Sequence, residues 1–301
     1  MAENKEILLE SGTNELEIME FAIADRYFGI NVAKVVEIMQ HQPVTPMPNS
    51  NPYVEGVFKP RENIVTVIDL ATFMGLPPSA DPEHDILIIT HFNKVNTAFH
   101  VHSVEAIHRL SWTEIEKPDS SIYGGEDALA TGIARVDGRL VTIVDFEKIL
   151  SDINPMSGIQ VSAVENLSGR QRHEYPILIA EDSPLLERLI LESLNKSGYT
   201  NVHVCSNGLE AWNVLTEMKE SGEVRSKISC LITDIEMPQM DGHRLIKLVR
   251  DDPAFKDLPC VIFSSLINEE MRKKGEALGA NAQLSKPDIA DLVYVIDSLV
   301  I

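Results

Sequence analysis

The sequence is short of cysteines, of aromatic residues, of basic residues and of long apolar runs. Its three cysteines, Cys205, Cys230 and Cys260, are an odd number, and each belongs to a short apolar segment in the C-terminal half. We therefore expect buried thiols that act as small core side chains and form no disulfides. The 301 residues include 26 Lys and Arg against 46 Asp and Glu, giving a formal net charge of −20. Such a deficit of positive charge argues against binding to nucleic-acid backbones or docking on anionic lipid.

No apolar run approaches the length of a membrane span. The first residues, Met1–Glu6, are polar and lack the apolar core of a signal peptide. We therefore expect a cytoplasmic protein with no direct membrane insertion. A length of 301 residues favours two domains.

Short apolar runs alternate with amphipathic helical patterns in the C-terminal half. The runs are 176–180, 201–205, 231–233, 261–263 and 282–285. This alternation predicts βα units around a buried parallel sheet, with five strands and five helices in about 125 residues, a usual size for one domain.

Polar residues follow these runs at positions that should meet. Glu181 and Asp182 follow the first run, and Asp234, Ser264 and Lys286 follow three later ones. Residues just beyond the carboxyl ends of parallel strands gather in one crevice. Three carboxylates there cannot all ionise without a cation, and their oxygens suit Mg²⁺. Asp234 would be the nucleophile that forms an acyl phosphate, with Lys286 and Ser264 contacting phosphoryl oxygens.

The order of these residues, together with the stretch ITDIEMPQMDG at 232–242, is similar to a response-regulator receiver domain over residues 175–301. The resemblance implies a flavodoxin-like fold whose strand order, 2-1-3-4-5, is that of the family. It also assigns roles. Glu181 and Asp182 would be the metal-binding pair for Mg²⁺, Asp234 the phosphoacceptor and a metal ligand, and Glu236 a ligand through its backbone carbonyl. Ser264 would be the switch hydroxyl and Lys286 the lysine that pairs with the phosphate.

Two positions depart from the receiver pattern. Gln283 stands where many receivers carry a switch Tyr or Phe, and Glu236 adds a carboxylate beside the phosphoryl group. The structural alternative to metal binding for Asp182 is the role of a helix N-cap before Ser183 and Pro184.

The N-terminal half is predicted to be mostly β. Strand-like alternation covers 16–23 and 27–32, turn signals lie at 24–26 and 137–139, and short helical patterns lie near 33–40, 69–75 and 145–152. Asp69 and Asp145 each precede one of these helices, and we interpret them as N-caps.

An internal repeat indicates two related β lobes of about 70 residues each. Small β lobes of this size usually close into barrels. The segment 64–70 echoes 140–146 at an offset of 76 residues, while Ile30, Val32, Val35 and Ile38 echo Phe99, Val101, Val104 and Ile107 at an offset of 69.

Four histidines cluster in this half: His91, His100, His102 and His108. On a strand, His100 and His102 would share one face and could bind a metal. Without partners at ligand spacing, we expect ordinary half-buried histidines. This half is then predicted to be a binding module.

Residues 14–156 resemble a CheW-like coupling domain, on the strength of Phe28-Gly29-Ile30, Val35–Ile38, Arg61 and 64–70. The resemblance implies two SH3-like five-stranded barrels, and it places Arg61 at the surface that contacts receptor and kinase. A solvating loop arginine is the alternative. The family usually has Arg-Gly and a Pro inside the strand, where this chain has Arg61-Glu62 and Thr66. Residues 157–174, polar and without periodicity, are interpreted as a linker.

A coupling domain followed by a receiver resembles the CheV family. The resemblance implies a chemotaxis scaffold that couples methyl-accepting chemoreceptors to the histidine kinase CheA at membrane receptor arrays. The receiver would accept a phosphoryl group and release it by autodephosphorylation, with no external substrate, so we do not expect an enzyme. One alternative is a phosphate sink that drains the kinase.

Another alternative is a magnesium-dependent phosphatase of the haloacid-dehalogenase type. That family has Asp-x-Asp at the nucleophile, where this chain has Asp234-Ile235-Glu236, and its acidic pair follows the lysine. A DNA-binding regulator is excluded, because no basic helix-turn-helix pattern follows the receiver.

Overall fold

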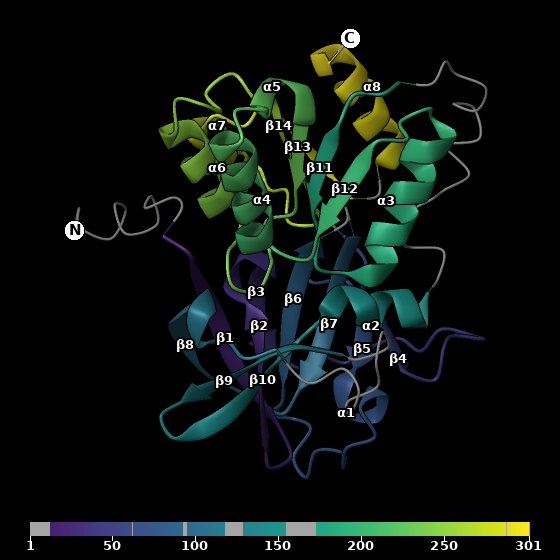
Figure 1. The fold of residues 1–301 in the computed structure, drawn as a ribbon. Helices are drawn as coiled ribbons and strands as arrows, with labels where there is room; N and C mark the ends of the chain where they lie inside the picture. The colour runs from purple at the N-terminus through teal and green to yellow at the C-terminus, as the bar shows by residue number, and fades with distance from the viewer. Residues whose placement is uncertain are drawn as a thin grey trace. The chain divides into compact units, whose positions relative to one another are not determined.

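The computed structural model describes residues 13–61, 63–92, 95–117, 129–154, 173–286 and 288–300. The chain divides into two compact units, Leu16–Ser157 and a second that includes Gly158–Ile301. We describe each unit by itself (Figure 1). The domain limits 14–156 and 175–301 stay a prediction, as does the linker, of which residues 157–172 lie outside the described part. Among the described residues, no helix is long and apolar enough to cross a membrane.

The second unit is an α/β domain with a five-stranded parallel sheet, as predicted, in the order β12-β11-β13-β14-β15. The strands are β11 (Ile177–Ala180), β12 (Val202–Cys205), β13 (Cys230–Thr233), β14 (Cys260–Ser264) and β15 (Ala282–Ser285). The helices are α3 (Pro184–Lys196), α4 (Gly208–Glu220), α5 (Val224–Lys227), α6 (Gly242–Asp251), α7 (Glu269–Leu278) and α8 (Ile289–Val300). The four-residue helix α5 was not predicted.

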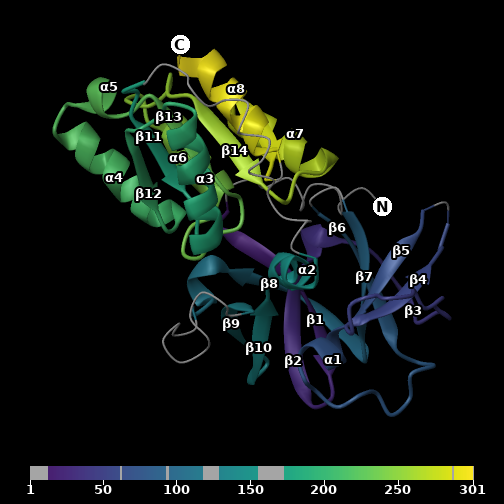
Figure 2. The same ribbon diagram turned by 90° about the vertical axis from the view of Figure 1, so that its right-hand side faces the viewer.

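Helices cover both faces of this sheet (Figures 1 and 2). One face packs on α3 and α8 through Ile190, Leu194 and Ile296, and α4, α6 and α7 lie together on the other. Local signals fix where the helices begin, because a side chain satisfies an unpaired N–H in the first turn. Asp241, for example, accepts a hydrogen bond from the Arg244 backbone N–H at 2.7 Å and starts α6. The three cysteines are buried free thiols, as predicted.

The described residues of the first unit form two five-stranded sheets and two α-helices, α1 (Leu70–Phe73) and α2 (Phe146–Ile153). One sheet has the order β8-β1-β2-β10-β9, and the other has the order β3-β6-β7-β5-β4. The strands are β1 (Glu15–Ile23), β2 (Arg26–Asn31), β3 (Val35–Gln40), β4 (Val54–Phe58), β5 (Val65–Asp69), β6 (Ile86–Phe92), β7 (Val95–Val101), β8 (Ser103–Ser111), β9 (Ala130–Val136) and β10 (Arg139–Val144).

Each sheet is closed by a short bridge beyond its first edge strand. Thr45, which follows β3, pairs with Val57 on β4 through backbone hydrogen bonds of 2.8 and 2.9 Å. Glu116, which follows β8, pairs in the same way with Ile133 on β9. Closure pairs the backbone groups that an open edge would expose. The prediction of two β-barrel lobes is therefore confirmed.

The sequence repeat corresponds to equivalent strands of the two barrels. The segment 64–70 forms β5 where 140–146 forms β10, and the other repeat matches β2 with β7 and β3 with β8. The barrels are nevertheless interleaved in the chain, because the first hairpin, β1–β2, joins the sheet of β8, β9 and β10. The core between them includes Phe21, Phe99 and Phe146, whose rings meet edge to face at 4.4 to 5.9 Å.

Two of the three predicted helices are present in this unit, and the third prediction was wrong. Asp69 and Asp145 accept backbone hydrogen bonds at the start of α1 and α2, as N-caps do. The helix predicted near 33–40 is a strand instead. Only a 3₁₀ turn, Val32–Lys34, precedes β3, whose side chains alternate between half-buried and exposed. A short run of β-branched residues fits either period, and here the pairing with β6 decides it.

His243 on α6 gives a pH-dependent test of the second unit. Burial, reinforced by the charge of Lys274, lowers the pKa of His243 to about 4. Among the described residues, its Nε2 has no hydrogen-bond partner. The unfolded chain, with an ordinary histidine pKa near 6.5, binds the proton first as the pH falls. The neutral His243 therefore leaves the free energy of unfolding undiminished above about pH 6.5. Roughly 3 kcal/mol of that free energy is lost as the pH falls to about 4.

We expect His243→Leu to remove this acid-side loss. The chain has two tryptophans, Trp112 and Trp212, one in each unit. Denaturant unfolding of the second unit can therefore be followed by Trp212 fluorescence in a Trp112→Phe background. The exposed His203 on β12 supplies a control, His203→Gln. An unchanged pH slope in His243→Leu would contradict the assignment.

Candidate functional site

The predicted site residues lie at one end of the parallel sheet. Glu181 and Asp182 follow β11, Asp234 follows β13, Ser264 is the last residue of β14, and Lys286 follows β15. Backbone hydrogen bonds continue the ladder beyond the strands, from Glu181 N–H to the Cys205 carbonyl and from Asp234 N–H to the Ala180 carbonyl, both at 3.0 Å. The sheet therefore brings together residues that are distant in sequence, as the order of the runs predicted.

Lys286 bridges two buried carboxylates. Its Nζ donates to Asp234 Oδ2 at 2.7 Å and lies 3.2 Å from Glu181. The side chains of Lys286, Asp234 and Glu181 are 6%, 5% and 2% exposed. A buried ammonium is tolerated when carboxylates hydrogen-bond to it in this way. Lys286 thus holds the carboxylate of Asp234 in a fixed position.

The site carries more negative charge than Lys286 neutralises. Oxygens of Glu181, Asp182 and Asp234 all lie within 4.8 Å of one another. Burial raises the pKa of Glu181 to about 8, and the charges of Asp234 and Asp182 add to this, while Lys286 opposes it. A divalent cation with oxygen ligands would relieve this excess. The donor set therefore fits Mg²⁺, with Glu181, Asp182 and Asp234 as the side chains that would hold it.

The loop after Asp234 depends on a glycine. Asp234 Oδ1 accepts a hydrogen bond from the Ile235 N–H at 2.6 Å. The loop then returns past the strand end, so that a Cβ on Gly242 would lie 1.8 Å from the Asp234 carbonyl oxygen. Only glycine permits this approach of α6. Glu236 lies in this loop, and its carbonyl as a metal ligand stays a prediction.

Ser264 and Gln283 lie on neighbouring strands, β14 and β15. Ser264 is fully buried, and its Oγ accepts a hydrogen bond from the Leu266 N–H at 3.3 Å. Gln283 is also buried, and its Nε2 donates to the Arg272 carbonyl on α7 at 2.6 Å. A Cβ on Gly275 would lie 2.4 Å from Gln283 Oε1. The amide that replaces the usual aromatic is therefore fixed against α7.

Arg61 belongs to the first unit. Its side chain is 77% exposed in the loop between β4 and β5, and its Nη2 is 2.9 Å from Glu37 Oε1 on β3. An ion pair this exposed contributes little to stability, about 0–1 kcal/mol. Arg61 is thus accessible to a partner.

The four clustered histidines have different environments. His102 Nδ1 accepts the Ala24 N–H at 2.9 Å, His91 contacts Asn96, and His108 contacts the buried Glu20 at 2.7 Å. His100 and His102 therefore do not form the metal pair that a shared strand face allowed. His100 instead meets His41 and Glu55, a grouping that the sequence did not reveal because these residues are 59 and 45 positions away.

Comparison with known proteins covers both units. Residues 17–154 match the CheW-like domain family, and residues 177–297 match the response regulator receiver domain family. Chemotaxis protein CheV3 of Helicobacter pylori is 30% identical over 288 residues, covering 91% of each chain. Chemotaxis protein CheV1 of the same organism is 26% identical over 303 residues, covering 94% of this chain and 92% of that protein. Chemotaxis protein CheW of Thermotoga maritima is 26% identical over 151 residues and covers 50% of this chain and 98% of that protein.

The excess negative charge predicts that Mg²⁺ stabilises the second unit. At a Mg²⁺ concentration of about 100 times Kd, the free energy of unfolding should rise by about 2.7 kcal/mol. Asp182→Ala should remove most of this gain, because it removes one ligand and one charge. Trp212 fluorescence in a Trp112→Phe background reports the change. Glu192→Gln, at an exposed surface pair on α3, is the matched control. Equal Mg²⁺ stabilisation of wild type and Asp182→Ala would place the cation elsewhere.

Proposed function

Because this chain belongs to the CheV family of chemotaxis proteins, we propose that it is a chemotaxis scaffold whose coupling is controlled by phosphorylation of Asp234. Its first unit would couple chemoreceptors to the histidine kinase CheA, at receptor arrays to which it is recruited. The observation that carries this proposal is the buried contact of 2.7 Å between Lys286 Nζ and Asp234 Oδ2. It holds the carboxylate of Asp234 at the end of β13, directly beside β14, the strand that carries the Ser264 hydroxyl.

The residues support phosphoryl transfer from a phosphohistidine to Asp234. An Asp234 carboxylate oxygen would form the new P–O bond as the P–N bond breaks, and the electron pair of that bond stays on the histidine nitrogen. Lys286 Nζ would shift from Asp234 Oδ2 to a phosphoryl oxygen, and Ser264 Oγ would donate to a second one. When bound, Mg²⁺ would neutralise charge on the phosphoryl oxygens. A water oxygen would then bond to phosphorus as the bond from phosphorus to the Asp234 oxygen breaks, which releases inorganic phosphate and restores the carboxylate.

The first unit has exposed apolar side chains at equivalent positions of its two barrels. Ile38 on β3 corresponds to Ile107 on β8, and these side chains are 43% and 59% exposed. Ile64, just before β5, corresponds to Leu140 on β10, at 69% and 59%. Exposed apolar side chains that recur in this way suit protein contacts. Two related surfaces, with Arg61 beside one of them in sequence, suit a scaffold that contacts two partners.

Asp234→Asn should abolish labelling by phosphorylated CheA, because the amide cannot act as the nucleophile. Incorporation of ³²P into the full chain measures this. Asp241→Asn is the matched control, since Asp241 is a buried aspartate of the same loop whose capping role an Asn also fulfils. Full labelling of Asp234→Asn would move the acceptor to another residue.

Coupling should reside in the first unit and its control in the second. The described residues of the first unit form hydrophobic clusters of their own, so a chain of residues 1–156 should fold and bridge receptor to kinase. Phosphorylation should change coupling by the full chain by about 1–3 kcal/mol, and it should not affect Asp234→Asn or the shortened chain. Receptor-stimulated kinase activity measures all three.

Two outcomes would overturn the scaffold proposal. One is failure of the shortened chain to couple receptor to kinase. The other is identical coupling by the full chain and Asp234→Asn under saturating phosphorylation, while only the full chain drains phosphate from the kinase. That second outcome would identify a phosphate sink.

A further inference from the structure

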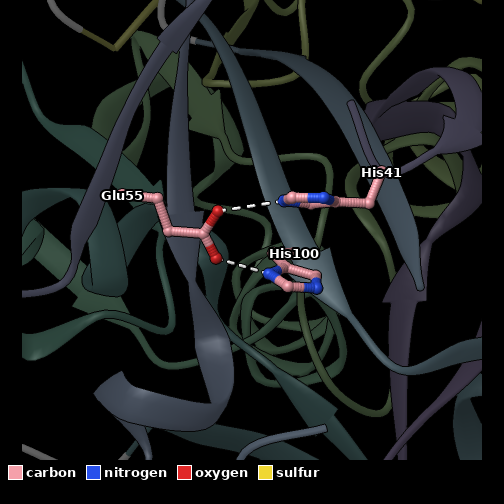
Figure 3. Close-up of side chains that lie close together, drawn as sticks. All are labelled: His41, Glu55 and His100. Atoms are coloured by element: carbon pink, nitrogen blue, oxygen red, sulfur yellow. Dashed lines mark hydrogen bonds and ion pairs between the residues drawn. The ribbon is translucent and has the colours of Figure 1, made fainter. Parts of the chain in front are cut away.

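A second group of possible metal ligands lies in the first unit, in the barrel formed by β3 to β7. His41 directly follows β3, Glu55 lies on β4 and His100 on β7. Figure 3 shows the two imidazole rings facing the same carboxylate. His41 Nε2 is 3.1 Å from Glu55 Oε2, and His100 Nδ1 is hydrogen-bonded to Glu55 Oε1. One ligand atom from each residue lies within 4.8 Å of the others.

The distance between His41 and Glu55 is close to that of a metal-bound set. Zn²⁺ binds imidazole nitrogen and carboxylate oxygen at about 2.0–2.2 Å, so ligand atoms at tetrahedral positions are about 3.4 Å apart. The observed separation of 3.1 Å between His41 Nε2 and Glu55 Oε2 is near this value, and one ligand atom from each of the three residues lies within 4.8 Å of the other two. Small side-chain rotations would therefore admit a metal ion. The three side chains are 12% to 20% exposed, so the site is sheltered yet reachable from solvent.

The buried carboxylate of Asp85 contacts the ring nitrogen of His100 that does not face Glu55. The second nitrogen of His100, Nε2, lies 2.8 Å from Asp85 Oδ2. Asp85, just before β6, is in turn held by Ser79 Oγ at 2.7 Å, and its carbonyl accepts the His41 N–H at 2.8 Å. A carboxylate that binds the far nitrogen of a ligating histidine fixes its ring and its tautomer. Asp85 is in this position for His100.

We propose that His41, Glu55 and His100 form a binding site for a divalent transition metal, with Zn²⁺ as the best match. Two imidazoles and one carboxylate suit Zn²⁺, and they leave a fourth position for water. Imidazole donors make the site unsuitable for Mg²⁺, which prefers oxygen ligands, so it differs in kind from the site at Asp234. The metal would join strands β3, β4 and β7 of the barrel, two of which are edge strands of the sheet.

The competing explanation is that the same four side chains form only a hydrogen-bonded network. In that case the network needs no ion, and Zn²⁺ would neither bind tightly nor stabilise the first unit. Titration of the metal-free full chain with Zn²⁺ against a chromogenic chelator separates the two. Millimolar Mg²⁺ is added during the titration to fill the acidic site predicted in the second unit, and Asp182→Ala should leave Zn²⁺ binding unchanged.

We expect about one equivalent of tightly bound Zn²⁺. Binding should be lost in His41→Gln and Glu55→Gln, and it should weaken roughly 10–100-fold in Asp85→Asn. His84→Gln is the matched control, since His84 lies beside Asp85 in sequence but has a side chain 74% exposed. Unchanged Zn²⁺ affinity in either ligand variant would overturn the proposal.

Two measurements on wild-type binding sites do not depend on how the ligand variants fold. Co²⁺ added in place of Zn²⁺ should give the visible absorption of a low-coordinate site with nitrogen ligands. In the presence of Mg²⁺, Zn²⁺ should raise the unfolding midpoint reported by Trp112 in a Trp212→Phe background, and it should not raise the midpoint reported by Trp212 when Trp112 is replaced. Absence of the Co²⁺ absorption, or of the Trp112 shift, would leave only the hydrogen-bonded network.

Discussion

The arrangement of the second unit depends on one buried ammonium between two buried carboxylates. Lys286 contacts both Asp234 and Glu181, and all three side chains are almost inaccessible to water. Removing one partner of such a group leaves an uncompensated charge, which typically costs about 3–5 kcal/mol. The contact is possible only if β11, β13 and β15 end at the same edge of the sheet. The site therefore requires this strand order. It also requires the loop after Asp234, in which Gly242 approaches the Asp234 carbonyl oxygen.

In the first unit the corresponding constraint is closure of each sheet. Short bridges at Thr45–Val57 and Glu116–Ile133 pair backbone groups that would otherwise form open edges. The barrel that contains β8, β9 and β10 also needs the β1–β2 hairpin. In that barrel β2 pairs with β10, which ends more than 110 residues later at Val144. The two barrels share a core through Phe21, Phe99 and Phe146, and the barrel of β1, β2 and β8 to β10 is built from two separated parts of the sequence.

The sequence predicted well what is determined locally. Buried strands and helix starts have short-range sequence signals. The sequence therefore predicted the apolar runs of the parallel strands, the residues that follow them, and N-caps such as Asp145. The segment 33–40 was misread as helical, since β-branched residues there fit two periods and pairing with β6 decides. The interleaving of the barrels and the meeting of His41, Glu55 and His100 depend on long-range pairing, to which no local pattern corresponds.

Gln283 bears on how a change at Asp234 would reach the rest of the chain. Here the buried amide donates to the Arg272 carbonyl at 2.6 Å, and Gly275 leaves it just enough room. A displacement near Ser264 would therefore move β15 and α7 together, as one hydrogen-bonded piece. Such a shift controls coupling only if a partner surface binds its two positions with different affinity. If phosphorylation of Asp234 controls coupling as proposed, α7 is the helix that the Gln283 hydrogen bond connects to such a change.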